Sequence, residues 1–217
     1  MSKDDRLSRA ASSGLLPDDA TCSALLDAIV DAARHSFGAA ACSITLLDET
    51  TDELVFAAVA GEGADTIIGD RFPADVGIAG WVLTSQQPLA VHEVEADPRF
   101  AADVAARTGY VPKALMAAPL FRDDRALGVF SVLDRDEQAR SELDAMDLLS
   151  ACARQASIAA ELIEGIRKGA AVARGEDPEL AAVARLAAAL DGLPAGRRED
   201  SLALLNALAS LVRGGAH

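Results

Sequence analysis

Residues 76–91 read VGIAGWVLTSQQPLAV, a stretch that contains the chain's only tryptophan, Trp81, and a Gly-x-x-Gly pair at Gly77 and Gly80. A phosphate-binding loop would need a lysine followed by serine or threonine directly after its last glycine, to hold the phosphates and a magnesium ion. An apolar run follows Gly80 instead, and the glycine spacing is not that of a dinucleotide-binding turn. We therefore expect Gly77 to permit a tight entry into a helix and Gly80 to let that helix approach a sheet closely.

The sequence on both sides of this stretch predicts helices and strands in alternation. Upstream, apolar residues at helical spacing end at Gly38, and two alternating runs follow with turn-forming residues between them. Downstream, Asp97-Pro98 has the chemistry of a helix start, and Ser141 with Asp144 forms a capping box. The expected helices are 18–37, 78–85, 98–109 and 141–168, and the expected strands are 41–49, 53–61, 89–97, 113–121 and 126–134, with a short extended piece around Pro73.

Three motifs in this order resemble the GAF domain, over about residues 20–166: GIAGWVLTSQQPLAV at 77–91, ADPRF at 96–100 and ALMAAPLFRDDRALGVFSVLD at 114–134. The resemblance implies an α+β fold with a central, mainly antiparallel six-stranded sheet. The terminal helices would cover one face of the sheet. Short helices and loops would enclose a small-molecule pocket on the other face, where the family's glycines shape the helix beside the pocket.

The resemblance also implies which residues line the pocket, because the segments that enclose it in the family can be located here. Small-molecule sites are mostly apolar with a few polar groups, and His92 and Tyr110 would supply those groups. The expected ligand-binding residues are Phe72, Ile78, Val82, His92, Phe100, Val104, Tyr110 and Met116. The sequence names neither the ligand nor a cofactor.

Subtypes of the family differ in the residues that they require. Cyclic-nucleotide-binding members carry an Asn-Lys-Phe-Asp-Glu signature from the last strand onward, where this chain has Asp134 and Arg135. Members that bind bilins or reduce free methionine sulfoxide need cysteines near the pocket, and none lies between residues 43 and 151. Haem-binding members place a histidine before the A-P-L strand; Tyr110 in that approach could ligate ferric haem in principle, but a tyrosine that caps an apolar pocket is favoured.

Composition and charge exclude further classes of protein. The formal net charge of −14 would repel nucleic acid and anionic membranes, so neither is an expected partner. Cys22, Cys42 and Cys152 are too few and too scattered for a disulfide framework, and Cys42 and Cys152 are expected in the core. No signal peptide is found and no run approaches the roughly 18 apolar residues of a membrane span, so we expect a cytoplasmic location.

A metal site and a catalytic centre are both weighed against the sequence and not expected. His92, Glu93, Glu95 and Asp97 lie close together in the sequence, as metal ligands would. If 89–97 is a strand, however, His92 faces one side of the sheet and the three acids face the other. No nucleophile, base and orienting group can be assembled from the spacing, so the protein is not expected to be an enzyme.

The helix expected at 141–168 would be about 42 Å long, more than a sheet-covering helix needs. It carries two apolar stripes, of which one can cover the sheet and the second needs a partner. The stripes are Leu143, Met146, Leu149, Ala153, Ala156, Ala160 and Ile163, and Leu148, Cys152, Ala159, Leu162 and Ile166. GAF proteins commonly dimerise through their terminal helices, so we expect a homodimer through the first and the long helix. The alternative is that the C-terminal helices of the same chain cover the second stripe.

The C-terminal segment differs from the rest of the chain in composition. Residues 169–217 hold five arginines and six acidic residues, a net charge of −1, with densely spaced alanines and leucines. We predict a flexible tail at 1–18, a GAF domain at 19–168, and a linker with a C-terminal helical hairpin at 169–217. An RNA-binding output domain would show a basic face. The leucines instead predict a packing or protein-docking element over 178–213, and the chain is similar to a bacterial, stand-alone GAF protein with a C-terminal helical extension.

These observations favour a non-catalytic sensory or regulatory module. It would bind a small molecule in the GAF pocket and signal through its terminal helices. One alternative is a protein–protein scaffold whose vestigial pocket is filled by Phe72, Trp81, Phe100 and Met116. Another is a redox or haem sensor, or a GAF-type reductase.

Overall fold

The computed structural model describes residues 19–174, and within them the chain up to Glu164 forms one compact unit. The predicted tail at 1–18 and the predicted helices within 178–213 lie outside the described residues. The last of the described helices, α6, begins at Glu142 and continues to Arg174, beyond the predicted end at Lys168.

A six-stranded antiparallel sheet forms the centre of the fold, in the order β3-β2-β1-β6-β5-β4. The predicted α+β architecture with a central antiparallel sheet is therefore confirmed. The two hairpins of the sheet, β1–β2 and β5–β6, match the predicted runs to within two residues at each end. The strands are β1 (Ala41–Asp48), β2 (Glu53–Gly61), β3 (Arg71–Pro73), β4 (Leu89–Val91), β5 (Leu115–Arg122) and β6 (Arg125–Leu133).

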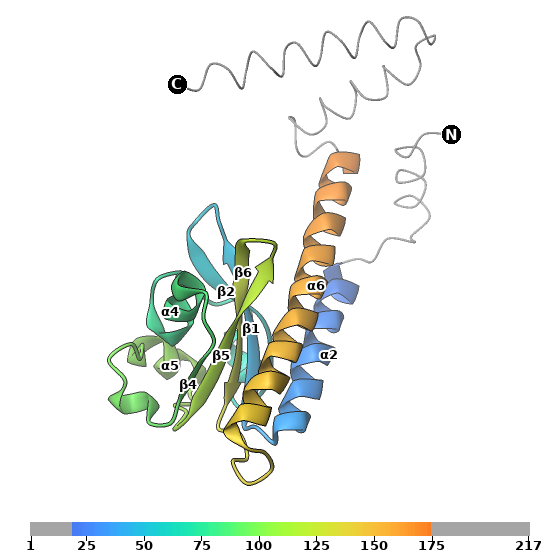
Figure 1. Cartoon of the computed structure of the whole chain (residues 1–217). Coiled ribbons are helices and arrows are strands. Elements are labelled where there is room, and N and C mark those ends of the chain that lie inside the picture. The colour runs from blue at the N-terminus through green and yellow to red at the C-terminus, as the bar shows by residue number, and fades with distance from the viewer. Residues whose placement is uncertain (1–18, 175–217) are drawn as a thin grey trace, which may run out of the picture. The chain divides into compact units, whose positions relative to one another are not determined.

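The terminal helices α2 (Asp19–Phe37) and α6 lie side by side on one face of the sheet (Figure 1). Strand alternation gives this face Cys42 and Ile44 of β1, which stand beside Val132 and Phe130 of β6, and all four side chains are buried. The first predicted stripe of α6 is buried from Leu149 onward, where small residues let the helix pack closely. Its first two residues are less buried: the side chain of Leu143, in the first turn of α6, is 74% exposed, and Met146 is partly buried.

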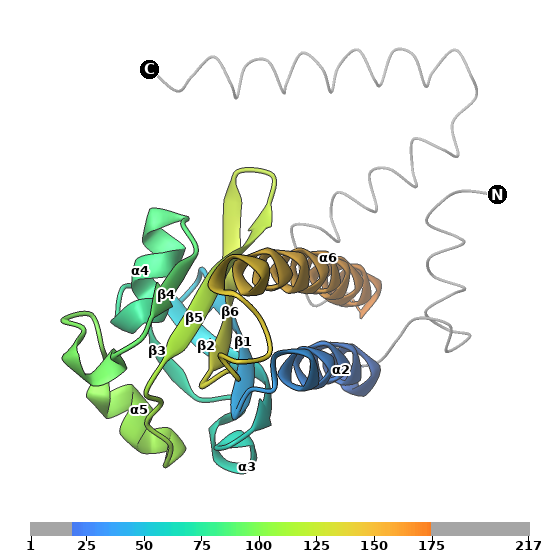
Figure 2. The same cartoon turned by 60° about the horizontal axis from the view of Figure 1, so that its bottom comes forward.

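The other face of the sheet is covered by α4 (Gly77–Ser85) and α5 (Ala102–Thr108) (Figure 2). A short helix, α3 (Ala64–Ile67), contacts β2 and α5, and a 3-10 turn, η1 (Val94–Ala96), follows β4. A hydrophobic cluster joins this layer to the sheet, with Val82 of α4 and Val129 of β6 both fully buried in it.

Two predicted elements differ from those observed. The strand expected at 89–97 ends at Val91, because the backbone turns into η1, where the Val94 N–H donates to the Lys113 carbonyl at 2.9 Å. The helix expected at 98–109 begins only at Ala102. Asp97 does not cap that helix, since its carboxylate accepts the Arg99 N–H at 2.9 Å and closes a tight turn before it.

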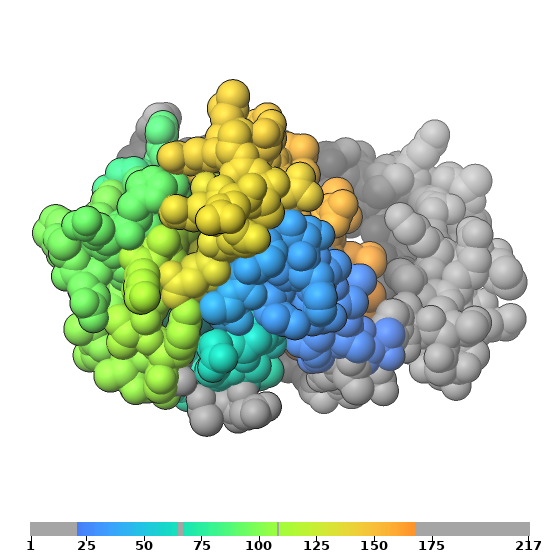
Figure 3. All heavy atoms as spheres, turned by 90° about the horizontal axis from the view of Figure 1, so that it is seen from below, coloured from blue at the N-terminus to red at the C-terminus, as the bar shows by residue number. Residues whose placement is uncertain are grey.

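At one end of the molecule the segment that leads into α6 lies against the end of α2, next to the segments around β4 and α5 (Figure 3). Here the predicted Ser141 cap is confirmed, because the Asp144 N–H donates to Ser141 Oγ at 3.2 Å. The Asp144 carboxylate accepts the Ser141 hydroxyl at 2.6 Å, where a complete capping box would have it accept the Ser141 N–H. The start of α6 therefore lies close to the end of β4.

Candidate functional site

A cavity of about 130 Å³ lies between the sheet and the layer formed by α4 and α5. β1, β2, β3, β5 and β6 contribute residues from the sheet, and the first turn of α4 and residues 100–112 contribute from the other layer. Phe56 and Phe72 pack against each other in its lining, with ring centroids 5.4 Å apart. The cavity therefore occupies the place at which the sequence predicted a ligand pocket.

Five of the expected site residues come together in this lining, and three do not. The five that line the cavity are Phe72, Ile78, Phe100, Val104 and Tyr110. They come from β3, α4, α5 and the turns beside α5, so the segments were identified correctly from the motifs. That these residues bind a ligand stays a prediction.

Val82, His92 and Met116 lie elsewhere. Val82 is fully buried one helical turn after Ile78, in the hydrophobic cluster between α4 and the sheet. Met116 alternates with Leu115 on β5, so that Leu115 faces the cavity and Met116 lies on the face that carries the terminal helices. His92 follows the last residue of β4 and turns away from the cavity.

Three residues with hydroxyl groups form the floor of the cavity and are not among those expected from the sequence. Ser43 and Thr45 on β1 and Ser131 on β6 line it, and all three residues are buried. Ser43 and Ser131 are directly opposite each other in the β1–β6 register, while the Thr45 hydroxyl donates to the Val129 carbonyl at 3.4 Å. The sequence pattern of β1 could have identified two of them. Side chains alternate along a strand, so if Cys42 and Ile44 lie beneath the helices, Ser43 and Thr45 must lie on the opposite face.

None of the described residues that line the cavity carries a charged side chain. Its remaining polar side chain is Tyr110, whose hydroxyl donates to the carboxylate of Asp134. Burial raises the pKa of Tyr110, and the hydrogen bond to Asp134 raises it further. Coordination of ferric iron would need the phenolate, so this arrangement does not fit a haem ligand and agrees with a capping role for Tyr110.

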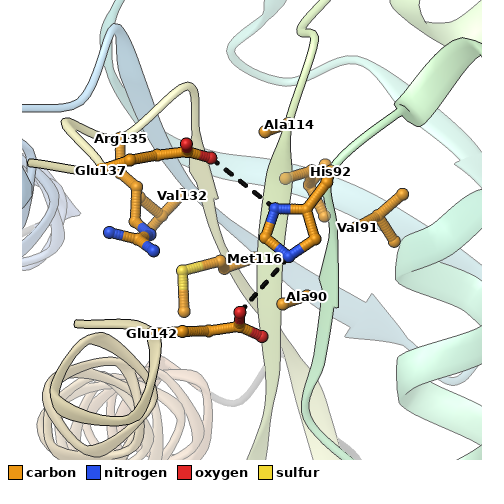
Figure 4. Close-up of a pocket in the computed structure, with 10 residues that line it drawn as sticks. Ala90, Val91, His92, Ala114, Met116, Val132, Arg135, Glu137 and Glu142 are labelled. Atoms are coloured by element: carbon orange, nitrogen blue, oxygen red, sulfur yellow. Dashed lines mark ion pairs between the residues drawn. The ribbon is translucent and has the colours of Figure 1, made fainter.

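A second, smaller hollow lies beside the start of α6 (Figure 4). His92 bridges two carboxylates there, with Nδ1 3.6 Å from Glu137 Oε1 and Nε2 3.4 Å from Glu142 Oε2. The histidine therefore turns toward acids that are remote in sequence and not toward Glu93 and Glu95. Within residues 19–174 no group of three or more His, Cys, Asp or Glu side chains is placed to hold a metal ion.

The glycine pair of α4 serves the backbone. Gly77 has a φ of +78°, a conformation that favours glycine, at the entry to the helix. Gly80 permits a close approach, although not to the sheet as predicted: a Cβ at this position would lie 2.4 Å from the backbone carbonyl carbon of Asp75. The loop immediately before α4 folds back onto the helix at this point, and the Gly80 N–H donates to the Val76 carbonyl at 3.1 Å.

We expect Gly80→Val to lower the free energy of unfolding by about 2 kcal/mol, because the added side chain must displace the backbone of Asp75. Chemical denaturation followed by circular dichroism measures this change. The matched control is Ala79→Val, the same product residue at the neighbouring position of α4, which is only partly buried. A Gly80→Val protein with unchanged stability and lost nucleotide binding would contradict the backbone role.

Asp97 and Arg99 link the turn before α5 to the tryptophan of α4. The Arg99 guanidinium donates to Asp97 at 2.6 and 2.9 Å, and it lies over the Trp81 ring at 4.7 Å from the centroid. Hydrogen bonding by the Arg99 side chain lowers the pKa of Asp97 from 3.8 to about 2. Because this pKa is lower in the folded state, the pair stabilises the fold above about pH 4, and that contribution is lost as the pH falls toward 2.

We expect the Asp97→Asn variant to lack this acid-dependent step, which amounts to about 1 kcal/mol because the guanidinium remains partly exposed. The fluorescence of Trp81, the only tryptophan in the chain, follows unfolding between pH 5 and pH 2. If the stability of the unaltered protein and that of Asp97→Asn fall in the same way between pH 5 and pH 2, the Asp97–Arg99 pair contributes nothing to stability.

A family model described as the GAF domain matches residues 22–160. The chain belongs to the GAF family. GAF domains are in general small-molecule sensory or regulatory modules, and they often dimerise. None of the described helices has both the length and the apolar character needed to cross a membrane.

Two curated relatives are cyclic phosphodiesterases, and the GAF chain covers only a small share of each. "Probable 3',5'-cyclic phosphodiesterase pde-5" of Caenorhabditis elegans is 29% identical over 100 residues, which are 45% of this chain and 14% of that protein. The cone cGMP-specific 3',5'-cyclic phosphodiesterase subunit alpha' of Bos taurus is 33% identical over 72 residues, 32% of this chain and 8% of that protein.

Solved structures share the fold at low sequence identity. The GAF domain of an Acinetobacter phosphoenolpyruvate-protein phosphotransferase has a TM-score of 0.57 at 20% identity and covers 76% of this chain and 97% of that one. The free methionine-R-sulfoxide reductase of Neisseria meningitidis, in complex with its substrate, has a TM-score of 0.53 at 22% identity, with 73% and 86% covered. These similarities confirm the GAF fold of the chain.

Proposed function

We propose that this GAF domain is a non-catalytic sensory or regulatory module, in which a small molecule binds in the cavity and changes the packing of α2 and α6. The observation that carries the proposal is the cavity itself, with its apolar lining and a floor of three hydroxyl groups. Such a combination, a mostly apolar enclosure with few polar groups, is typical of small-molecule sites.

The central strands connect the cavity to the terminal helices. In β1, Ser43 and Thr45 face the cavity while Cys42 and Ile44 face the helices. A shift of β1 or β6 on ligand binding would therefore reach α2 and α6 directly. A further link is the Phe121 N–H of β5, which donates to Ser157 Oγ of α6 at 3.0 Å.

The cysteines of the described residues support a binding role over redox chemistry. The Cys42 thiol is fully buried, and burial raises its pKa to about 12. Burial also raises the pKa of Cys152. Since the thiolate is the reactive form, both thiols are poor nucleophiles. Three free cysteines also support the proposed cytoplasmic location, where thiols stay reduced.

A homodimer through α2 and α6 is the second part of the proposal. Apolar side chains on these helices remain exposed, with Leu25 at 41%, Ile158 at 68% and Leu162 at 56%. A helix pair that presents such residues to water is stabilised by a partner surface. Residues 178–213, proposed as a packing or protein-docking element, lie outside the described residues.

Two alternatives receive less support. In the scaffold alternative Trp81 and Met116 would help to fill the pocket, but Trp81 is 36% exposed and neither residue lines the cavity. Cyclic nucleotides, which the names of the phosphodiesterase relatives suggest, carry a phosphate. Among the described residues that line the cavity, no cationic side chain is present to pair with it.

Native mass spectrometry of the freshly purified full chain tests the proposal, because it reports both bound mass and subunit number. We expect a dimer that carries a small molecule, and hydrogen exchange in α2 and α6 should change when the molecule is removed by dialysis. A chain that retains no molecule and responds to none in a metabolite screen would contradict the sensory role.

A further inference from the structure

We infer that the cavity takes an uncharged, mainly apolar molecule of about the size of one aromatic ring, held by a single polar group at the Ser43–Ser131 hydroxyl pair. This inference rests on the proposed function and specifies its ligand class. Three features of the cavity carry it: its size, the absence of charge in its described lining, and the position of its hydroxyls.

The size limits the ligand to a small molecule. The cavity measures about 130 Å³, and an engineered protein cavity of roughly 150 Å³ accommodates benzene. A ligand of about one ring therefore matches the cavity in size. A cyclic nucleotide, with a fused base, a sugar and a phosphate, is much larger.

The lining disfavours ionised ligands. A charge that is removed from water needs an opposite charge or several hydrogen bonds as compensation. Among the described lining residues there is neither a cation nor an anion, and the nearby carboxylate of Asp134 already accepts the Tyr110 hydroxyl and the Lys113 and Ala114 N–H groups. Both anionic and cationic ligands would therefore lose more solvation than the cavity restores.

One polar group on the ligand is accommodated at a defined place. Ser43 and Ser131 lie side by side on neighbouring central strands, so their hydroxyls can donate to or accept from the same ligand atom. The third hydroxyl of the floor, that of Thr45, already donates to the Val129 carbonyl, and the lining also includes the apolar residues Phe56 and Leu115. An amide, ketone or hydroxyl substituent on a ring matches this pattern.

The test uses three molecules of nearly equal shape that differ in charge: benzamide, benzoate and benzamidine. Binding to the full-length protein is measured by ligand-observed NMR at neutral pH. We expect benzamide to bind at least tenfold more tightly than either ion. Ser131→Ala should weaken benzamide binding roughly 3- to 10-fold, the effect of one lost hydrogen bond, and should leave benzene binding unchanged.

Val104→Trp is expected to abolish binding, because Val104 lines the cavity and the larger ring would fill it. The matched control is Val111→Trp, the same substitution at an exposed position outside the lining, which should bind benzamide as the unaltered protein does. Circular dichroism confirms that both variants are folded. Benzamide binding that survives Val104→Trp would place the site elsewhere and overturn the inference.

Two further outcomes would also overturn it. Tighter binding of benzoate would mean that the start of α4 holds an anion, and tighter binding of benzamidine would mean that the site takes cations. If none of the three binds while native mass spectrometry shows another retained molecule, the ligand class is wrong and the proposed function stands. If nothing binds and nothing is retained, both fail.

Discussion

Gly128→Ala is expected to unfold this GAF domain or to lower its free energy of unfolding by at least about 3 kcal/mol, the largest single-residue effect that we predict. Gly128 lies in β6, the central strand between β1 and β5, opposite Leu46 on one side and Leu120 on the other. A Cβ at this position would lie 2.0 Å from the carbonyl oxygen of Thr45. Since β6 is held on both sides, it cannot move away from β1 without breaking one of the two ladders.

The matched control is Gly165→Ala in α6, where an added Cβ meets no atom within 4 Å. Alanine is favoured over glycine in a helix, so this variant should be as stable as the original or more stable by up to about 1 kcal/mol. Thermal and chemical denaturation of both variants measures the difference. Equal stabilities for Gly128→Ala and Gly165→Ala would show that the β1–β6 contact is looser than the structure indicates.

The fold was predictable because its patterns are local and long. The alternation in β1 and the apolar runs of β5 and β6 each extend over eight or nine residues, so period and hairpin turns identified them. The serine cap at Ser141, with an acid at Asp144, placed the start of α6 to within one residue. The short elements were less predictable: β4 has three residues, and the backbone bond between Val94 and Lys113 that ends it depends on contacts remote in sequence.

The site was predictable as a set of segments but not as a set of side chains. Phe100 and Tyr110 were placed correctly because they follow from the order of the motifs. Met116 and Leu115 are neighbours in β5, and only the phase of that strand relative to β1 decides which of them faces the cavity. Ser43 and Ser131 could have indicated this, because polar residues within otherwise apolar strands mark the face that borders the cavity. Ala117 of β5 pairs with Ser131, so Leu115, two residues before it, faces the same side.

The position of His92 could not be derived from the sequence. Its partners Glu137 and Glu142 lie more than forty residues further along the chain, and the contact exists only because the start of α6 is folded against the end of β4. From the sequence, only the acids next to His92 in the chain, Glu93, Glu95 and Asp97, were considered, and they were expected to face away from it. Local charge patterns are therefore a weak guide where the chain turns.

Asp134→Ala is the second variant with a large expected effect, a loss of about 3 kcal/mol in the free energy of unfolding. The carboxylate accepts the Lys113 N–H at 2.9 Å and the Ala114 N–H at 2.8 Å, and it also accepts the Tyr110 hydroxyl. Alanine would leave all three donors without this acceptor, and hydrogen bonds to a charged group contribute roughly 1.5–3 kcal/mol each. Asp134 also has a φ of +49°, which alanine adopts less readily than aspartate or asparagine.

The control Asp134→Asn retains an amide oxygen for the two N–H groups and tolerates the same backbone conformation, so it should lose no more than about 1 kcal/mol. Its informative readout is the titration of Tyr110, the only tyrosine in the chain, by phenolate absorbance. Burial makes the largest contribution to the raised pKa of Tyr110, and Asp134 adds to it through its hydrogen bond and its charge. Asp134→Asn should therefore lower this pKa toward, but not down to, its ordinary value of about 10.

The raised pKa of Tyr110 also determines how the stability of the domain responds to alkaline pH. Because the folded state holds the phenol in its neutral form, the contribution of Tyr110 is complete below about pH 10 and is lost as the pH rises above that value. Asp134→Asn, with a smaller upward shift, should lose less stability over the same range. If both proteins show the same alkaline loss and the same phenolate titration, Asp134 does not hold Tyr110 in the cavity wall, and the cavity would have to be closed by its apolar residues alone.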